Sequence, residues 1–374
     1  MPNLGKFLDV NKFIRMVSGK KGSVLGIDIG SSAIKVIQLG ERKGKVVLEN
    51  YGELALGPYA GVGVGQSVVL TKTKIKEALG DILREANISG TQAILSIPMG
   101  SALLSLIELP KVDRKQLNSM IPLEARKYIP VPVSEVMLDW WILPRPDDTV
   151  ETEVVEEGKE YKKEKTEVLL AAIHNDTVEK YKDIKSVVNI PSSSFEIDIF
   201  SAIRSVVGRD NSVVMVVDMG AGTTKLAVVD FGILRMQHII NMGSQDVSIT
   251  VSKMLKISID EAEKIKREEG LNSSKKEVLN AVQIPLNHIA SEINKVIANY
   301  RKKHSRPITR IVLTGGGVLL KGFSEFARTN INVPVEVGDP FSRVETPVFL
   351  KDTLKEAGPE FAVALGLAIK AIQE

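Results

Sequence analysis

A short motif occurs twice in this chain, and it constrains the fold more than any other feature. Both copies read Asp-x-Gly-x-x-x-x-Lys, and they begin at Asp28 and Asp218. Each follows a run of apolar, largely β-branched residues, which predicts a strand buried on both faces. A turn of small residues comes after the Asp, and a second apolar strand returns beside the first. The repeat predicts two similar lobes that face each other across a cleft.

The small residues at the two turns are suited to phosphate binding. Backbone N–H groups can approach a phosphate closely where no bulky side chain stands in the way. An Asp at the end of the strand would place a carboxylate where a Mg²⁺ that bridges phosphates needs a hard oxygen ligand. For a single copy, an ordinary hairpin with an Asp beside it would be the better interpretation. Two copies, one in each lobe, favour a clamp around a phosphate-containing ligand.

Composition excludes several other kinds of site. The chain has no Cys, which excludes disulfides, thiolate catalysis and Cys-ligated zinc. Its four His are scattered without the spacing of metal ligands, and the formal net charge of +3 gives no reason to expect a nucleic-acid partner. No apolar run reaches the roughly 18 to 20 residues of a membrane span, and no signal peptide is visible. We therefore expect a soluble, cytoplasmic protein.

Around the first hairpin the pattern predicts further elements. Residues 4–17 predict an amphipathic helix, either docked on the protein or lying on a membrane surface. The Gly-rich residues 57–67 predict a surface loop. From about Met99 to Ile184, strands and helices alternate in a small α+β unit inserted into the first lobe, with Asp113 as the N-cap of its first helix. Within this unit, residues 147–165 are charged and predict a solvated hairpin tip.

The second half of the chain reads as mostly helical outside its hairpin. We expect helices over residues 192–207, two within 241–270, and others over 275–304, 318–328 and 356–372. A short buried strand over 311–313 precedes Thr-Gly-Gly-Gly.

Taken in order, these pieces resemble the actin-like ATPase superfamily. GIDIGSSAIK is similar to its first phosphate motif, VVDMGAGTTK to its second, and IVLTGGGVLLKGF to its adenosine motif. The resemblance implies an α/β fold of two duplicated ribonuclease-H-like lobes around a nucleotide cleft, with a small inserted α+β subdomain. It implies these parts: an N-terminal segment (1–21), a first lobe (22–98), the inserted subdomain (99–184), a first hinge helix (185–211), a second lobe (212–355) and a C-terminal hinge helix (356–374).

The resemblance also carries site residues over to this chain. Asp28 and Asp218 would hold Mg²⁺, mostly through its waters. Lys35 would neutralise the β- and γ-phosphates of ATP. Glu263 and Lys266, one helical turn apart, match a pair that contacts ribose. The residues that would donate to the phosphates are Gly30, Ser31, Ser32, Gly220, Gly222, Thr223 and Thr224, and those that would admit adenine are Gly315, Gly316 and Gly317.

Any hydrolysis would need an acid that orients the attacking water. In relatives this group comes from the first hinge helix, where Asp198 registers best here and Glu196 second. A solvated or helix-capping carboxylate is an equal alternative for either residue. Because no strong base stands out, we expect ATP hydrolysis to be slow or absent.

Within the superfamily, the chain is most similar to the PilM family of type IV pilus assembly, with the division protein FtsA next. Residues 124–140 and 243–266 carry the similarity to PilM. FtsA continues into a separate membrane helix, whereas this sequence ends at Glu374 directly after the second hinge helix, which favours PilM. Two further functions fit the same motifs: an FtsA-like membrane tether of cell division, and a small-molecule kinase with the same clamp.

The PilM resemblance implies partners as well as ligands. The cofactors would be ATP and Mg²⁺. The main partner would be the cytoplasmic N-terminal tail of a PilN-like inner-membrane protein, bound in a groove beside the inserted subdomain. The alternative is that the subdomain merely caps the first lobe. The protein would lie at the inner face of the cytoplasmic membrane, held there by its partner, beside other pilus platform proteins and with scope for homo-oligomers.

Overall fold

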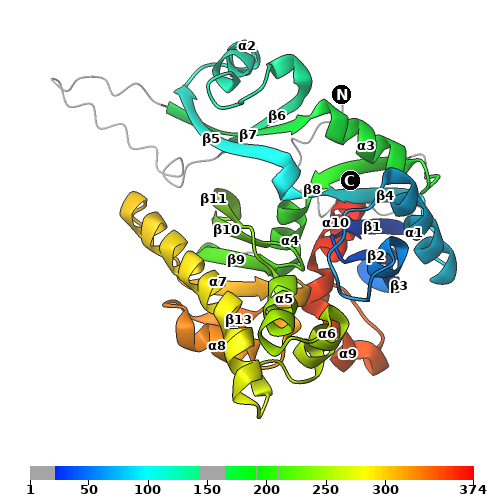
Figure 1. The fold of residues 1–374 in the computed structure, drawn as a ribbon. Helices are drawn as coiled ribbons and strands as arrows, with labels where there is room; N and C mark the ends of the chain where they lie inside the picture. Colours follow the sequence, from blue (N-terminus) through cyan, green and yellow to red (C-terminus); the bar gives the residue numbers. More distant parts are fainter. Residues whose placement is uncertain (1–21, 144–164, 191, 209) are drawn as a thin grey trace. The chain divides into compact units, whose positions relative to one another are not determined.

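This computed structural model describes residues 22–143, 165–190, 192–208 and 210–374 (Figure 1). The described residues form two compact units, one made of Gly100–Tyr181 and the other of residues 22–99 and Lys182–Glu374. The helix predicted over residues 4–17 and all but the end of the charged tip predicted over 147–165 lie outside the described residues. None of the described helices is long and apolar enough to cross a membrane.

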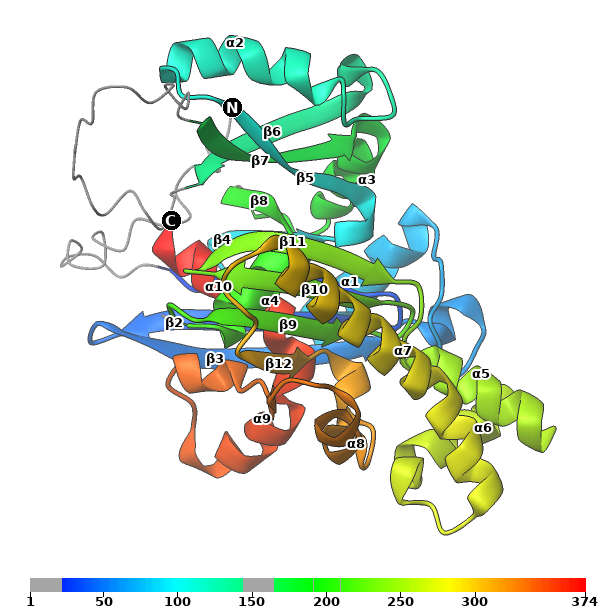
Figure 2. The ribbon, with the colours of Figure 1, turned by 90° about the vertical axis from the view of Figure 1, so that its left-hand side faces the viewer.

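The larger unit contains two five-stranded sheets with the same strand order (Figure 2). In each, three antiparallel strands form a meander, and two parallel strands extend the sheet from the first strand of the meander. This duplicated topology confirms the two predicted lobes. In sheet order the strands of the first lobe are β3 (Lys45–Ala55), β2 (Ala33–Arg42), β1 (Val24–Ile29), β4 (Gln92–Ile97) and β8 (Ser192–Ile197). Those of the second are β11 (Ile233–Ile240), β10 (Thr224–Asp230), β9 (Val213–Met219), β12 (Arg310–Thr314) and β13 (Val335–Val337).

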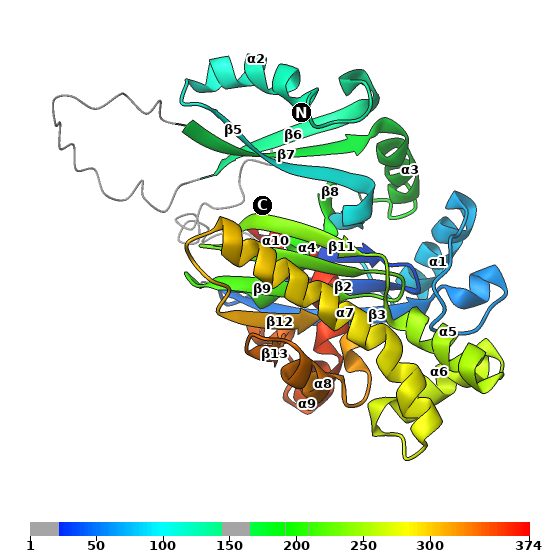
Figure 3. The ribbon, with the colours of Figure 1, turned by 60° about the vertical axis from the view of Figure 1, so that its left-hand side comes forward.

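Helices cover the second sheet because its strands carry a continuous apolar face. Figure 3 shows α7 lying across this sheet, and its apolar side packs with Met215 and Val217 of β9 in one buried core. Apolar residues at helical spacing along α7 produce that face, although Pro285 lies within the helix. The helices of this lobe are α5 (Ser244–Leu255), α6 (Ile259–Glu268), α7 (Lys276–Lys303) and α8 (Phe323–Asn330).

In the first lobe the C-terminal helix packs unusually close to its neighbours. Gly26 of β1 makes this approach feasible, because a Cβ there would collide with the carbonyl oxygen of Ala364. Gly366 plays the same part toward Ser201 of α4. The two glycines therefore allow α10 to pack backbone to backbone with the sheet and with α4. The helices of this lobe are α1 (Lys72–Glu85), α4 (Asp198–Val206), α9 (Lys351–Ala357) and α10 (Ala362–Gln373).

The smaller unit is an antiparallel sheet of order β5-β7-β6 with one face packed on α2. Asp113 caps α2 as predicted, accepting from the Gln116 backbone N–H at 2.8 Å. Trp140 packs on the α2 side. Trp141 lies on the other face, in one row across the sheet with Leu106 and Leu169. The elements are β5 (Ala102–Pro110), α2 (Arg114–Ala125), β6 (Val136–Leu143), β7 (Lys165–His174) and the following α3 (Asn175–Lys185).

The helix predicted over residues 192–207 was wrong for its first six residues. These form β8, which pairs in parallel with β4 and completes the first sheet. Three consecutive Ser residues favour helix weakly, so pairing with a distant strand decides the conformation. As a result Glu196 lies on a strand, and Asp198 is the first residue of α4 rather than a residue from its middle.

Two other predicted helices are interrupted, and two strands were not predicted. Over 318–328, Gly322 adopts a φ of +82° and starts α8 after a short 3₁₀ turn. Over 356–372, a 3₁₀ segment that contains Pro359 separates α9 from α10. Strands β11 and β13 were missed. β13 has only three residues, so its own pattern carries little signal.

Candidate functional site

The tips of the two phosphate hairpins face each other across the larger unit. Each tip closes with the same bond, from Gly30 N–H to Ala33 O at 3.0 Å and from Gly220 N–H to Thr223 O at 2.9 Å. A Cβ built on Gly222 would lie 3.6 Å from Ser31 Oγ of the opposite tip. The fold therefore brings both predicted phosphate turns together, with small residues at the point of approach.

A buried cluster of charge lies at the base of these turns. The Lys225 ammonium is 2.8 Å from Asp198 Oδ2 and 3.1 Å from Asp218 Oδ2. Asp198 and Asp218 are both buried, and the Lys225 side chain is only 16% exposed. Asp28 completes the cluster and accepts from Ser96 Oγ at 2.8 Å. The predicted metal ligands and the first-choice catalytic acid thus lie around one lysine.

Burial and charge compete in this cluster. Burial raises the pKa of Asp28 to about 6, against the opposing effects of Lys225 and Lys35. Burial likewise raises the pKa of Asp198, although Lys225 opposes that shift. Burial disfavours the Lys225 ammonium, but Asp198 and Asp218 outweigh it and hold the pKa of Lys225 well above its ordinary value. Lys225 therefore remains charged at any physiological pH.

Lys35, the predicted phosphate lysine, has different neighbours. Its ammonium lies 3.1 Å from Glu53 Oε1 and 3.8 Å from Glu360 Oε2. Burial disfavours the charge, yet these two carboxylates raise the pKa of Lys35 above its usual range. The side chain is therefore a permanent cation, held at the first hairpin by two acids.

The two candidate catalytic acids have separate surroundings. Asp198 accepts from the Met99 backbone N–H at 3.0 Å and pairs with Lys225. Glu196 instead accepts two hydrogen bonds from the Arg204 guanidinium, at 2.7 and 2.8 Å. It also contacts Ser201 of α4 and Lys370 of α10. Glu196 thus ties β8 to α4 and α10, and Asp198 is the acid that lies in the cluster.

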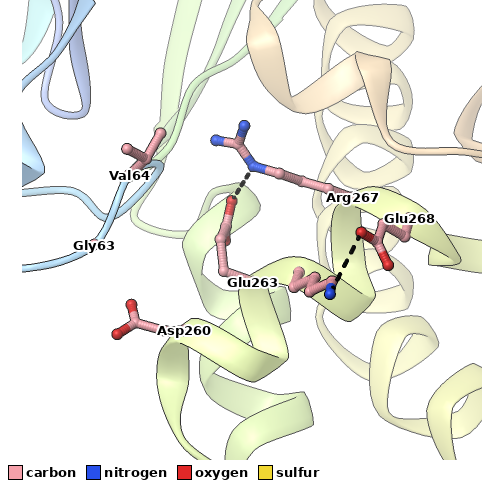
Figure 4. Close-up of a pocket in the computed structure, with 7 residues that line it drawn as sticks. Gly63, Val64, Asp260, Glu263, Arg267 and Glu268 are labelled. Atoms are coloured by element: carbon pink, nitrogen blue, oxygen red, sulfur yellow. Dashed lines mark hydrogen bonds and ion pairs between the residues drawn. The ribbon is translucent and has the colours of Figure 1, made fainter.

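Glu263 and Lys266, the predicted ribose pair, bind each other on α6. Lys266 Nζ lies 2.6 Å from Glu263 Oε2, and Ser248 Oγ donates to the same oxygen at 2.5 Å. Arg267 Nε is 2.8 Å from Glu263 Oε1 (Figure 4). Burial opposes ionisation of Glu263, but Lys266 and Arg267 outweigh it and lower its pKa. An open pocket of about 380 Å³ borders Glu263, Arg267 and Gly63, and none of the phosphate-turn residues lines it.

The remaining predicted residues divide into two groups. Gly315 lies against the end of β9. Its φ of +87° favours glycine, and a Cβ there would collide with Asp218 Oδ1; Gly317 packs against Met219. Thr224 is fully buried, and its hydroxyl donates to Met242 O at 2.9 Å. The Thr224 hydroxyl therefore serves the fold, whereas Gly315 joins the adenosine motif to the charge cluster.

Residues 57–67, predicted only as a surface loop, connect the two lobes. We call this segment the strap. Gln66 Nε2 donates to Asp260 Oδ1 at 2.9 Å, and the Ser67 backbone N–H donates to Gln245 Oε1 at 2.7 Å. The strap thus reaches from the first lobe to α5 and α6 of the second. Its Gly-rich composition was the available signal, but composition alone does not indicate which helices such a loop meets.

Comparisons with known proteins agree with this architecture. The family described as "Type IV pilus assembly protein PilM" matches residues 26–372. Cell division protein FtsA of Neisseria meningitidis serogroup B is 29% identical over 177 residues, which cover 41% of this chain and 41% of that protein. The match therefore spans about two fifths of the length of that relative.

Solved structures are similar over most of the chain. A PilM-PilN type IV pilus biogenesis complex matches with a TM-score of 0.77 and 22% identity, covering 93% of this chain and 98% of that one. MreB 5 of Spiroplasma citri bound to AMPPNP matches with a TM-score of 0.51 and 12% identity, covering 95% and 98%. At these identities the structures show the fold alone, which is the actin-like ATPase fold. From the match to residues 26–372, the chain belongs to the PilM family of type IV pilus assembly proteins.

Proposed function

We propose that this pilus-assembly protein binds ATP between its two hairpins and acts as a nucleotide-binding structural component. One observation carries the proposal: two copies of the same turn face each other above a buried cluster of carboxylates and lysine. Turns of small residues suit phosphate because backbone N–H groups can reach it, and two such turns suit a polyphosphate. The Gly30 and Gly220 N–H groups close the turns themselves, so the donors would be the other residues of each turn. MreB 5, which shares the fold, is a protein solved with a nucleotide analogue.

Mg²⁺ would accompany the nucleotide, held through its waters by Asp28 and Asp218. In the described part of the chain no three His, Asp or Glu side chains are arranged to hold a metal ion by themselves. A magnesium ion here would depend on phosphate oxygens and water for most of its ligands, as is usual for this ion. Its contribution would be to neutralise charge on the β- and γ-phosphates.

Hydrolysis should be slow. A general base must be within hydrogen-bond reach of the water it activates. Both carboxylate oxygens of Asp198 already have partners, Met99 N–H and Lys225, and Glu196 is held by Arg204. We expect kcat without a partner to stay below about 1 s⁻¹, the low end of typical enzymes.

Calorimetry of the full chain with Mg-ATP tests nucleotide binding. We expect measurable affinity for the wild type and a loss of about tenfold or more, roughly 1.4 kcal/mol, for Lys35→Met, which removes the cation at the first hairpin. Asp352→Ala, at an exposed position on α9, is the control and should bind like the wild type. No heat of binding for the folded wild type would exclude the proposal.

The smaller unit is the proposed binding surface for the cytoplasmic tail of a PilN-like membrane protein. The two-lobe clamp is complete without this unit, so the unit needs another reason to be present. On its sheet face away from α2, Leu106, Leu169 and Trp141 form an apolar row, in which Leu169 is buried and Leu106 is 40% exposed. Apolar anchors of this kind, beside the edge strands β5 and β6, suit an extended peptide. Such a partner would keep the protein at the inner face of the cytoplasmic membrane, near other platform proteins.

A matched pair of variants tests the tail surface. Leu106→Asp should reduce binding of a PilN-like N-terminal peptide by about tenfold or more. Leu123→Asp places the same charge on α2, where Leu123 is 59% exposed, and should leave peptide binding unchanged. The reverse result would move the surface to α2, and no effect of either would point to a unit that only caps the lobe.

A further inference from the structure

Lys225 lies at the base of the two phosphate turns, where three carboxylates converge from different elements. Asp28 comes from β1, Asp198 from the start of α4, and Asp218 from β9. The Lys225 ammonium contacts the last two, and it is the strongest of the charges that counter the burial effect on the Asp28 pKa. The lysine therefore lies among the groups that a phosphate-bound cation would be expected to use.

The charges of this cluster determine the electrostatic environment of a bound polyphosphate. Without Lys225, the buried carboxylates of Asp198 and Asp218 and the partly buried one of Asp28 would face an anionic ligand, and like charges at short range are strongly unfavourable away from water. With Lys225, one permanent positive charge is fixed in place by 2.8 and 3.1 Å ion pairs. Lys35 supplies a second cation beside Asp28 but remains bound to Glu53 and Glu360.

We propose that Lys225 is a tethered cation of the nucleotide site, which makes the affinity for ATP largely independent of Mg²⁺. The inference rests on the proposed ATP binding and specifies how the site balances its charge. Because the ammonium is covalently attached, its position requires no free metal ion. Mg²⁺ then adds little to affinity, although it can still enter with the nucleotide.

A simpler role for Lys225 makes a different prediction. The Asp198–Lys225 pair joins α4, which packs in the first lobe, to β10 in the second. If Lys225 served only to hold the lobes together, its loss would weaken ATP binding equally with and without Mg²⁺. The ratio of the two affinities therefore separates a tethered cation from a structural tie.

The experiment measures ATP affinity of the full-length protein by calorimetry, once with excess Mg²⁺ and once with EDTA. For the wild type we expect the two affinities to agree within about threefold. For Lys225→Met, the side chain keeps its length but loses its charge, and we expect the ratio to rise to about tenfold or more in favour of Mg²⁺. Lys225→Arg should restore the wild-type ratio.

Lys35→Met is the matched control, since Lys35 holds the same position in the first hairpin. It should weaken binding by the same factor in both conditions. Two results would overturn the inference. One is a wild type that binds ATP more than about tenfold more tightly with Mg²⁺ than with EDTA. The other is a ratio of these two affinities in Lys225→Met that equals the wild-type ratio. If Lys225→Met does not fold, the ratio measured for the wild type is sufficient to test the inference. Absence of ATP binding in both conditions would instead refute the proposed function.

Discussion

The two phosphate hairpins share a motif and a register but use their lysines differently. In the strand register, Asp28 of β1 lies opposite Lys35 of β2, just as Asp218 of β9 lies opposite Lys225 of β10. The next strand of each sheet makes the difference. Glu53 of β3 lies directly opposite Lys35, whereas Ile239 of β11 lies opposite Lys225.

Residues directly opposite in antiparallel strands have side chains on the same face and within contact. Lys35 therefore meets a carboxylate on its own sheet, 3.1 Å away, and remains there. Lys225 meets an apolar side chain and turns instead to Asp198 and Asp218. The neighbouring strand, rather than the motif, thus sets the role of a motif residue.

The largest expected effect concerns the strands that lead into the two motifs. Gly26 and Val216 both lie two residues before the Asp, and a Cβ on Gly26 would collide with the backbone of α10. Adding one carbon by Gly26→Ala should cost 3 kcal/mol or more, at the upper end of about 1–3 kcal/mol for overpacking, whereas Val216→Ile should cost about 1 kcal/mol. Urea unfolding midpoints measure both. Equal shifts would show that the two strands are packed alike.

The second effect uses the acid of the first hairpin. The folded-state pKa of Asp28 is about 6 against an ordinary 3.8, so the folded protein binds more protons than the unfolded chain between these values. Stability should therefore fall as pH rises from about 4 to 6, by about 2–3 kcal/mol for this group. Asp28→Asn should remove that part of the pH dependence, measured by unfolding at several pH values.

Ser96→Ala sharpens this test, because Ser96 donates to Asp28 and lowers its pKa. Without the hydroxyl, the folded-state pKa of Asp28 should rise, so the upper limit of the pH window should move upward while its lower limit stays. An unchanged pH profile in Asp28→Asn would mean that another group carries the dependence.

A third variant would make the second hairpin resemble the first. Ile239→Glu places a carboxylate opposite Lys225, as Glu53 lies opposite Lys35. The ammonium should be drawn toward it, and ATP affinity in EDTA should fall by about fivefold to tenfold. Ile239→Gln is the control of similar size without charge. A loss with Gln as large as that with Glu would assign the effect to packing.

The smallest effect is the reverse change. Glu53→Gln releases Lys35 from its cross-strand partner, and because the Glu53 side chain is 40% exposed, the pair should be worth less than about 1 kcal/mol. ATP affinity should rise by about two- to threefold. Glu41→Gln, an exposed position on β2, should leave it unchanged. A fall in ATP affinity with Glu53→Gln would show that Glu53 holds the Lys35 ammonium in place for the phosphates, rather than competing with them for it.

The elements that could be predicted are those whose signal lies in a few consecutive residues. Apolar strands ending in Asp and a small-residue turn predicted both hairpins, and the repeat predicted two lobes. Asp113 and its α2 followed from capping chemistry. β8 was mistaken for helix because its conformation depends on pairing with β4, about a hundred residues earlier in the chain.

The site was predictable to a similar extent. The small turn residues, Asp28 and Asp218 were read from the motif, and Asp198 from the resemblance of the first hinge helix to that of relatives. The fold brings the three acids together around Lys225, and their roles stay predictions. The role of Lys225 could not be predicted, since it depends on Ile239 of the neighbouring strand and on the start of α4. The structural engagement of Glu196 with Arg204 likewise depends on where β8 ends.

The strap bears on the rate of nucleotide exchange rather than on nucleotide affinity. Because Gln66 and Ser67 of the first lobe are bonded to Asp260 and Gln245 of the second, the lobes cannot separate until both contacts break. Each such bond is worth about 1 kcal/mol net, so together they would slow opening by roughly thirtyfold if the open form keeps neither. A nucleotide held behind them would have a residence time set by the opening of the protein. Exchange would then be timed by two contacts of the strap rather than by the phosphate turns themselves.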